Sequence, residues 1–151
     1  SFVRIIEEDF RKIGYCKVPA NIPDPSKAIT GAGQHDIQFL TDVDNDGNVD
    51  VVKYWIGSIS GAGATPNPRD MMLYRQVNSQ PASPLSLGLT KFDFLFFDAQ
   101  ADSLAFPVTV PSSIYSMRLS VILESPFAYD SLYSFAYWRQ LRLAARNLKN
   151  R

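Results

Sequence analysis

Residues 2–14 of the chain, FVRIIEEDFRKIG, carry the pattern that decides the fold class. The charged side chains in this stretch fall on one face of a helix, and the apolar side chains, three or four residues apart, fall on the other. Gly14 is placed to end the helix, and three prolines before residue 26 prevent it from resuming. We therefore predict an amphipathic helix over residues 1–14, with an apolar stripe formed by Phe2, Ile5, Ile6, Phe10 and Ile13.

Beyond this helix the apolar residues come in short stretches separated by turn-forming residues. This pattern is typical of β-strands. In one stretch Phe92, Phe94 and Phe96 share a face, where we expect them to build the core. Loops rich in glycine, proline and polar residues are predicted over 57–70 and 80–88. The predicted strands are residues 36–41, 51–56, 71–77, 90–97 and 114–123.

The C-terminal segment 135–148 carries two conflicting patterns. Its Ala, Leu, Arg and Gln residues favour a helix. Its larger apolar residues share one parity, as in a strand whose buried face holds Phe135, Tyr137, Leu141 and Leu143. Both interpretations remain open on these patterns alone.

Length and composition limit the class of protein. The chain has 151 residues, the size of one domain, so residues 1–151 are expected to form a single α+β domain with a β-rich region at 29–151. A hydrophobic content of 46% excludes wholesale disorder. Fifteen basic and fifteen acidic residues cancel, so the chain lacks the positive field that nucleic-acid binding usually requires. With one cysteine, Cys16, no intrachain disulfide can form.

The sharpest local motif is DVDNDGNVD, residues 42–50. Oxygen-bearing side chains at alternate positions, with Gly47 for the tight turn, match the first half of a calcium-binding loop. The twelfth position carries Lys53 in place of a bidentate Glu, and a strand follows instead of a helix, so this is not an EF-hand. The missing ligand favours a polar hairpin tip. The alternative is a weak calcium site made by Asp42, Asp44, Asp46, Asn48 and Asp50.

Candidate catalytic residues do not form a constellation. His35 is the only histidine, and a general base needs a nucleophile or a positioned water beside it. The run Gly57–Gly61 has Ile59 at the centre, where a nucleophile elbow requires its nucleophile. We therefore expect a protein that works by binding or assembly and not as an enzyme, with no cofactor other than calcium.

One stretch resembles a known family. Residues 6–15, IEEDFRKIGY, resemble the helix end of minor pilins of the type IV pilus, in the PilW-like group, where an acidic-aspartate-apolar-arginine run closes on Gly-Tyr. Further stretches resemble the strands of that group in the same order. They are residues 37–39 (IQF), 51–54 (VVKY), 73–75 (LYR), 87–92 (LGLTKF) and 141–148 (LRLAARNL). The J-type pseudopilins of type II secretion share this plan.

The resemblance implies a pilin-like fold in which segment 135–148 is the closing strand. It also implies that a prepilin cleavage site and a hydrophobic half-helix, which anchors such subunits in the inner membrane, have been removed before residue 1. The protein would then take part in assembly, initiation or capping of a type IV pilus or type II secretion pseudopilus. Its partners would be other pilin or pseudopilin subunits. It would lie in the periplasm and cell envelope, or outside the cell within the filament.

A second class of function fits the same residues. The chain is alternatively a free-standing secreted binding module, dependent on calcium at residues 42–50, whose ligand enters a groove between loops. The upstream sequence distinguishes the two classes. A short basic leader and about twenty apolar residues running into Phe2 would establish the pilin.

Overall fold

The computed structural model describes residues 2–58, 71–124 and 135–143 of the chain. Within these ranges one helix, α1 (Phe2–Arg11), precedes seven strands. Single turns of 3-10 helix occur at Pro19–Asn21, Pro25–Lys27 and Pro111–Ser113. The strands are β1 (Ile29–Ala32), β2 (Asp36–Thr41), β3 (Asp50–Ser58), β4 (Met71–Val77), β5 (Ser83–Phe97), β6 (Ser116–Glu124) and β7 (Phe135–Leu143).

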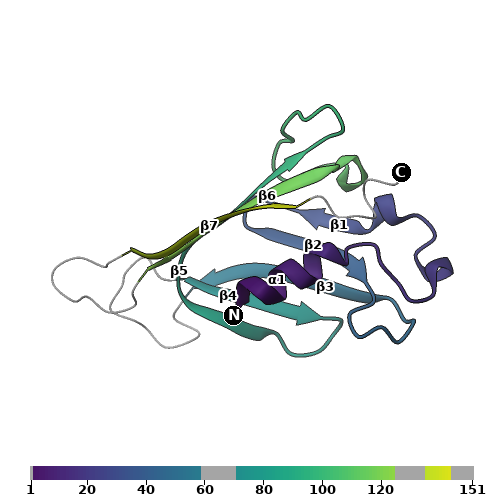
Figure 1. Cartoon of the computed structure of the whole chain (residues 1–151), viewed down its shortest axis with the longest axis horizontal. Helices are drawn as coiled ribbons and strands as arrows, with labels where there is room; N and C mark the ends of the chain where they lie inside the picture. Colours follow the sequence, from purple (N-terminus) through teal and green to yellow (C-terminus); the bar gives the residue numbers. More distant parts are fainter. Residues whose placement is uncertain (1, 59–70, 125–134, 144–151) are drawn as a thin grey trace.

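The strands form one sheet in which each strand pairs antiparallel with the next in sequence, from β1 to β7. Helix α1 (purple) lies across this sheet, in front of β3 and β4 in Figure 1. One helix beside an antiparallel sheet agrees with the predicted α+β class. The helix ends at Arg11, before the predicted boundary, and Gly14 turns the chain with φ of 81°. No helix in the described ranges is long and apolar enough to cross a bilayer.

The strand predictions hold for β2, β3, β4 and β6, but the loop predicted at residues 80–88 is wrong from residue 83 onward. Strand β3 also covers the first two residues of the loop predicted at 57–70, and residues 59–70 lie outside the described ones. Strand β5 begins at Ser83 and includes Pro84, which has no N–H to donate to a ladder. The β4–β5 ladder accommodates it because the register shifts on either side of Leu73. Strand β1 was not predicted as a separate strand, since its four residues are too few to show a period.

Strand β5 belongs to two ladders. It pairs with β4 up to Leu89 and with β6 from Leu89 onward. Beyond Leu89 the edge of β5 that faced β4 is taken by the β1–β2 turn. There the Phe94 N–H donates to the Gln34 carbonyl oxygen at 2.8 Å. Farther along, Val108 N–H donates to the Ala32 carbonyl oxygen at 2.9 Å. The start of the sheet is therefore held against the middle of β5, although the two are far apart in sequence.

The core lies between α1 and the inner face of the sheet. Ile6, Phe10 and Ile13 are fully buried, so the second half of the predicted stripe packs on the strands; the Phe2 side chain lies outside the described ones. The Phe10 ring centroid is 5.5–6.0 Å from those of three strand residues, Tyr54, Phe39 and Phe94. Full burial of such a ring stabilises the fold by about 1.5–3 kcal/mol.

A buried carboxylate also joins the helix to the sheet. Arg75 on β4 binds Asp9 through two nitrogens, with Nε 2.7 Å from Oδ2 and Nη2 3.2 Å from Oδ1. The Tyr54 hydroxyl on β3 donates to the same Oδ2. Because Tyr54 and Arg75 are opposite each other in the β3–β4 ladder, one helix side chain links two strands.

The protonation states of this network are mutually consistent. Burial, and then the charge of Asp9, raise the pKa of Tyr54 well above its usual value, so the hydroxyl stays a donor. Burial lowers the pKa of Arg75, but the hydrogen bond and charge of Asp9 outweigh it and the pKa is raised overall. The Asp9 carboxylate is thus paired with the Arg75 guanidinium and accepts hydrogen bonds from both Arg75 and the Tyr54 hydroxyl. A buried charge requires such partners.

The C-terminal segment is a strand over the part that the structure describes. Strand β7 pairs antiparallel with β6, and its residues Leu141 and Leu143 stand in register with the buried Leu119 and Met117. The strand prediction is therefore confirmed for residues 135–143. The β7 side chains and residues 144–148, which belong to the same prediction, lie outside the described ones.

The network predicts a large cost for removing either charged partner. Asp9→Asn or Arg75→Met alone should lower the free energy of unfolding by about 2–4 kcal/mol, since each leaves a buried group without its counter-charge; the partial exposure of Arg75 tempers the loss. The double variant should lose clearly less than the sum of the two. Urea denaturation of the four proteins measures the coupling. Strictly additive losses would contradict a direct interaction.

Candidate metal centre

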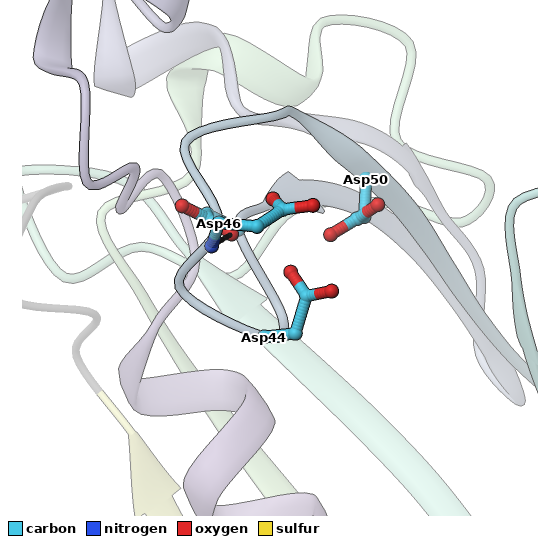
Figure 2. Close-up of side chains that lie close together, drawn as sticks. Asp44, Asp46 and Asp50 are labelled. Carbon is cyan, nitrogen blue, oxygen red and sulfur yellow. Dashed lines mark hydrogen bonds between the residues drawn. The ribbon is translucent and has the colours of Figure 1, made fainter.

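The turn between β2 and β3 brings four carboxylates together. Oxygen atoms of Asp42, Asp44, Asp46 and Asp50 all lie within 4.8 Å of one another. Asp42 is buried, Asp44 and Asp46 are exposed, and Asp50 is intermediate. In Figure 2 the carboxylates of Asp44, Asp46 and Asp50 point toward a common space beside the turn. Four of the five predicted ligands are therefore neighbours.

Two residues with left-handed backbone allow the chain to turn so tightly. Asn45 has φ of 61° and Gly47 has φ of 90°. Asparagine tolerates this region, and glycine adopts it without a steric penalty. The Asp46 carboxylate reinforces the bend by accepting from the Asn48 backbone N–H at 2.9 Å. The Asp-Asn-Asp-Gly sequence thus determines the turn that gathers the acidic side chains.

Asp42 stabilises the turn from within. Its Oδ2 accepts from the N–H groups of Lys17 (3.1 Å) and Gly47 (2.8 Å), and its Oδ1 accepts from Asp46 N–H (3.0 Å). Burial raises the pKa of Asp42, but these three backbone donors outweigh it and lower the pKa to about 2. Its stabilisation is therefore complete above the ordinary pKa of 3.8 and is lost as the pH falls through about 2.

The segment after α1 supports the turn from the other side. Lys12 Nζ donates to the Val43 carbonyl oxygen at 2.9 Å, and Asn21 Nδ2 donates to the Gly47 carbonyl oxygen at 2.7 Å. The Tyr15 hydroxyl donates to the side chain of Asn45. These contacts join residues about thirty apart in sequence, and no local pattern predicts them. The turn is thus part of the same assembly as the helix.

Asn78, in the turn after β4, was missed by the sequence analysis. Its Nδ2 donates to Asp50 Oδ1 at 2.9 Å, and its Oδ1 accepts from Val51 N–H at 2.9 Å. Asp50 Oδ2 accepts from Val43 N–H at 3.0 Å. Asn78 has φ of 56°, so its position marks a turn, but its spatial partner is not visible in the sequence. Asp50 is therefore oriented by donors on both oxygens.

The carboxylate cluster is suited to bind a hard cation with modest affinity. Burial, and then the hydrogen bond and charge of Asp46, raise the pKa of Asp44. Carboxylate oxygens are the donors that Ca²⁺ prefers, so the residues fit calcium. Asn48, however, donates its Nδ2 to Asp46 Oδ2 at 3.1 Å. Lys53 lies on β3 with Nζ 5.2 Å from the Trp55 ring centroid, and it supplies no ligand.

We predict weak calcium binding, with a dissociation constant of about 1 mM, because the open ligands are few and no bidentate glutamate closes the loop. Isothermal titration calorimetry with millimolar calcium should show a heat of binding. The heat should vanish in Asp44→Ala and persist in Asp102→Asn, an exposed carboxylate after β5 that serves as a control. Binding should weaken as the pH falls, since the raised pKa of Asp44 lets protons compete. Submicromolar affinity would contradict a site in which only Asp44, Asp46 and Asp50 face the ion.

A backbone prediction tests the turn itself. Gly47→Ala should lower the free energy of unfolding by about 1–2 kcal/mol, since φ of 90° is strained for alanine and its Cβ would lie 3.1 Å from Val18 Cγ2. Gly31→Ala is the control, because a Cβ there meets only an ordinary contact at 3.5 Å. Urea denaturation compares the two. Equal losses would show that the left-handed turn is not required.

Comparison of the chain with protein-family models, with curated proteins and with solved structures gives no match.

Proposed function

We propose that this chain is the globular domain of a minor pilin or pseudopilin that takes part in assembly, initiation or capping of a type IV pilus or a type II secretion pseudopilus. A subunit of this kind must hold its assembly helix firmly on its globular domain, because contacts between subunits pass through that helix. The ordered set of resembling stretches supports the proposal. So does the way α1 is attached.

The observation that carries the proposal is the double attachment of α1 to the sheet. Phe10 packs on aromatic rings of three strands, and Asp9 binds Arg75 and Tyr54. Asp9 and Phe10 are also the centre of the Glu8-Asp9-Phe10-Arg11 run on which the resemblance depends. The residues that resemble the pilin helix end are thus those that fix this helix to the sheet.

The remaining face of α1 is available to neighbouring subunits. Arg4, Glu8 and Arg11 are exposed, and Ile5 among them is a large apolar residue with 38% of its surface exposed. Under the proposal, the partners are other pilin or pseudopilin subunits. The protein is anchored in the inner membrane before assembly, lies in the periplasm, and reaches the cell exterior within the filament.

A free-standing secreted binding module is the second candidate. The convergence of Asp44, Asp46 and Asp50 favours it, since calcium-stabilised loops are common in extracellular modules. The reading frame upstream of residue 1 separates the two. A basic leader and about twenty apolar residues support the pilin, and their absence would overturn it.

The assembly test uses Ile5. In the organism that encodes the chain, deletion of the gene should reduce surface filaments or pseudopilus-dependent secretion, and the wild-type gene should restore them. The Ile5→Arg gene should restore roughly a tenth or less of the wild-type filaments or secretion, because a charge would enter the contact between subunits. Val110→Arg, at a residue 57% exposed outside the helix, should restore fully. Equal restoration by both variants would contradict the proposed contact.

A further inference from the structure

A depression of about 390 Å³ lies at the end of the β2–β3 hairpin opposite the Asp42–Asp50 turn. Asp36 and Trp55, which face each other in the ladder, form its floor together with Lys53. His35 and Ile56 complete the lining. The volume falls within the range of small-ligand sites.

The aromatic part of the depression is held in place before any ligand arrives. The Trp55 and Tyr74 rings stack with centroids 5.6 Å apart and planes 20° from parallel. Gly57 makes room for this stack, because a Cβ there would lie 2.8 Å from Tyr74 Cε2. The Lys53 ammonium also lies over this ring, with Nζ 5.2 Å from its centroid, so a ligand would meet the part of the half-exposed indole that Tyr74 and Lys53 leave open.

The polar part offers hydrogen-bonding groups of both kinds. In the described part of the chain, the Asp36 carboxylate, the Lys53 ammonium and the indole N–H of Trp55 make no hydrogen bond. His35 Nδ1 is 2.9 Å from Asp93 Oδ1 and 3.1 Å from the Phe92 carbonyl oxygen, which leaves Nε2 open. The depression therefore presents the acceptor-only carboxylate of Asp36 beside two donors, the Lys53 ammonium and the Trp55 indole N–H.

Glycine at position 33 also permits the present position of the carboxylate. A Cβ at Gly33 would come within 2.3 Å of Asp36 Oδ1, so only glycine permits the present position of this oxygen. A larger residue would push the carboxylate away from its place beside Trp55. Gly33 thus leaves room for the Asp36 carboxylate at this end of the hairpin.

These features select the chemistry of the ligand. Asp36 and Lys53 carry opposite charges, so neither a simple anion nor a simple cation gains from both. A neutral ligand with hydroxyl groups can donate to the carboxylate and accept from the ammonium, and its C–H face can lie on the indole. We propose that this depression binds a neutral sugar in its pyranose form. The proposal stands independently of the assembly role.

The experiment measures the fluorescence of Trp55 while a sugar is added. The chain has two tryptophans, so Trp138→Phe leaves Trp55 as the sole indole fluorophore. The methyl glycosides of glucose, galactose, mannose and N-acetylglucosamine are titrated singly at millimolar concentrations. At least one glycoside should give a saturable change in Trp55 fluorescence, with matching amide chemical-shift changes at residues 36 and 53–56. Asp36→Asn and Gly33→Ala should each weaken that binding about tenfold, and Asp102→Asn should not.

Folding is checked independently by the chemical shifts of the core strands, and Trp55→Ala, followed by NMR alone, should abolish binding. The proposal is overturned if no sugar gives a saturable change. Binding that survives both Asp36→Asn and Trp55→Ala would also overturn it. So would tighter binding of an acidic peptide such as oligoglutamate, which would assign the depression to an anionic partner.

Discussion

The structure depends on one buried carboxylate. Asp9 is surrounded by core residues, and the ion pair with Arg75 and the hydrogen bond from Tyr54 are what make its charge tolerable there. The geometry is demanding, because the two partners come from neighbouring strands and the carboxylate comes from the helix. Hydrophobic packing of Phe10 would accept several rotations of α1, but the bidentate contact of Arg75 accepts few. The ion pair therefore specifies the position of the helix, while apolar burial supplies most of the stability.

A second polar network continues from the end of that helix. Lys12, Tyr15 and Asn21 reach the Asp42–Asp50 turn, and Thr41 donates its hydroxyl to the Lys12 carbonyl oxygen at 2.6 Å. The turn is thus fixed by hydrogen bonds from residues that precede it by about thirty positions. A cation would add to an arrangement that is already formed, which is consistent with modest affinity.

Local patterns predicted what local forces decide. The spacing of Ile6, Phe10 and Ile13 predicted the helix and its buried stripe. Alternation predicted β2, and β-branched and aromatic residues predicted β3. The first half of β5 escaped prediction because Pro84 and Gly88 favour loops, and tertiary pairing with β4 overrides that preference. Asn78 and Gly33 escaped for a different reason. Their roles depend on a partner brought near by the fold, Asp50 for one and Asp36 for the other.

The two faces of β3 connect the interior with the proposed sugar site. Val52 and Tyr54 point into the core, and the residues between and after them, Lys53 and Trp55, belong to the outer surface. A shift of one residue in register would exchange the two sets and place a lysine against Phe10. The bond from Tyr54 to Asp9 opposes this shift, since only the present register brings the hydroxyl to the helix. The buried network therefore holds Trp55 and Lys53 beside Asp36, although it touches none of them.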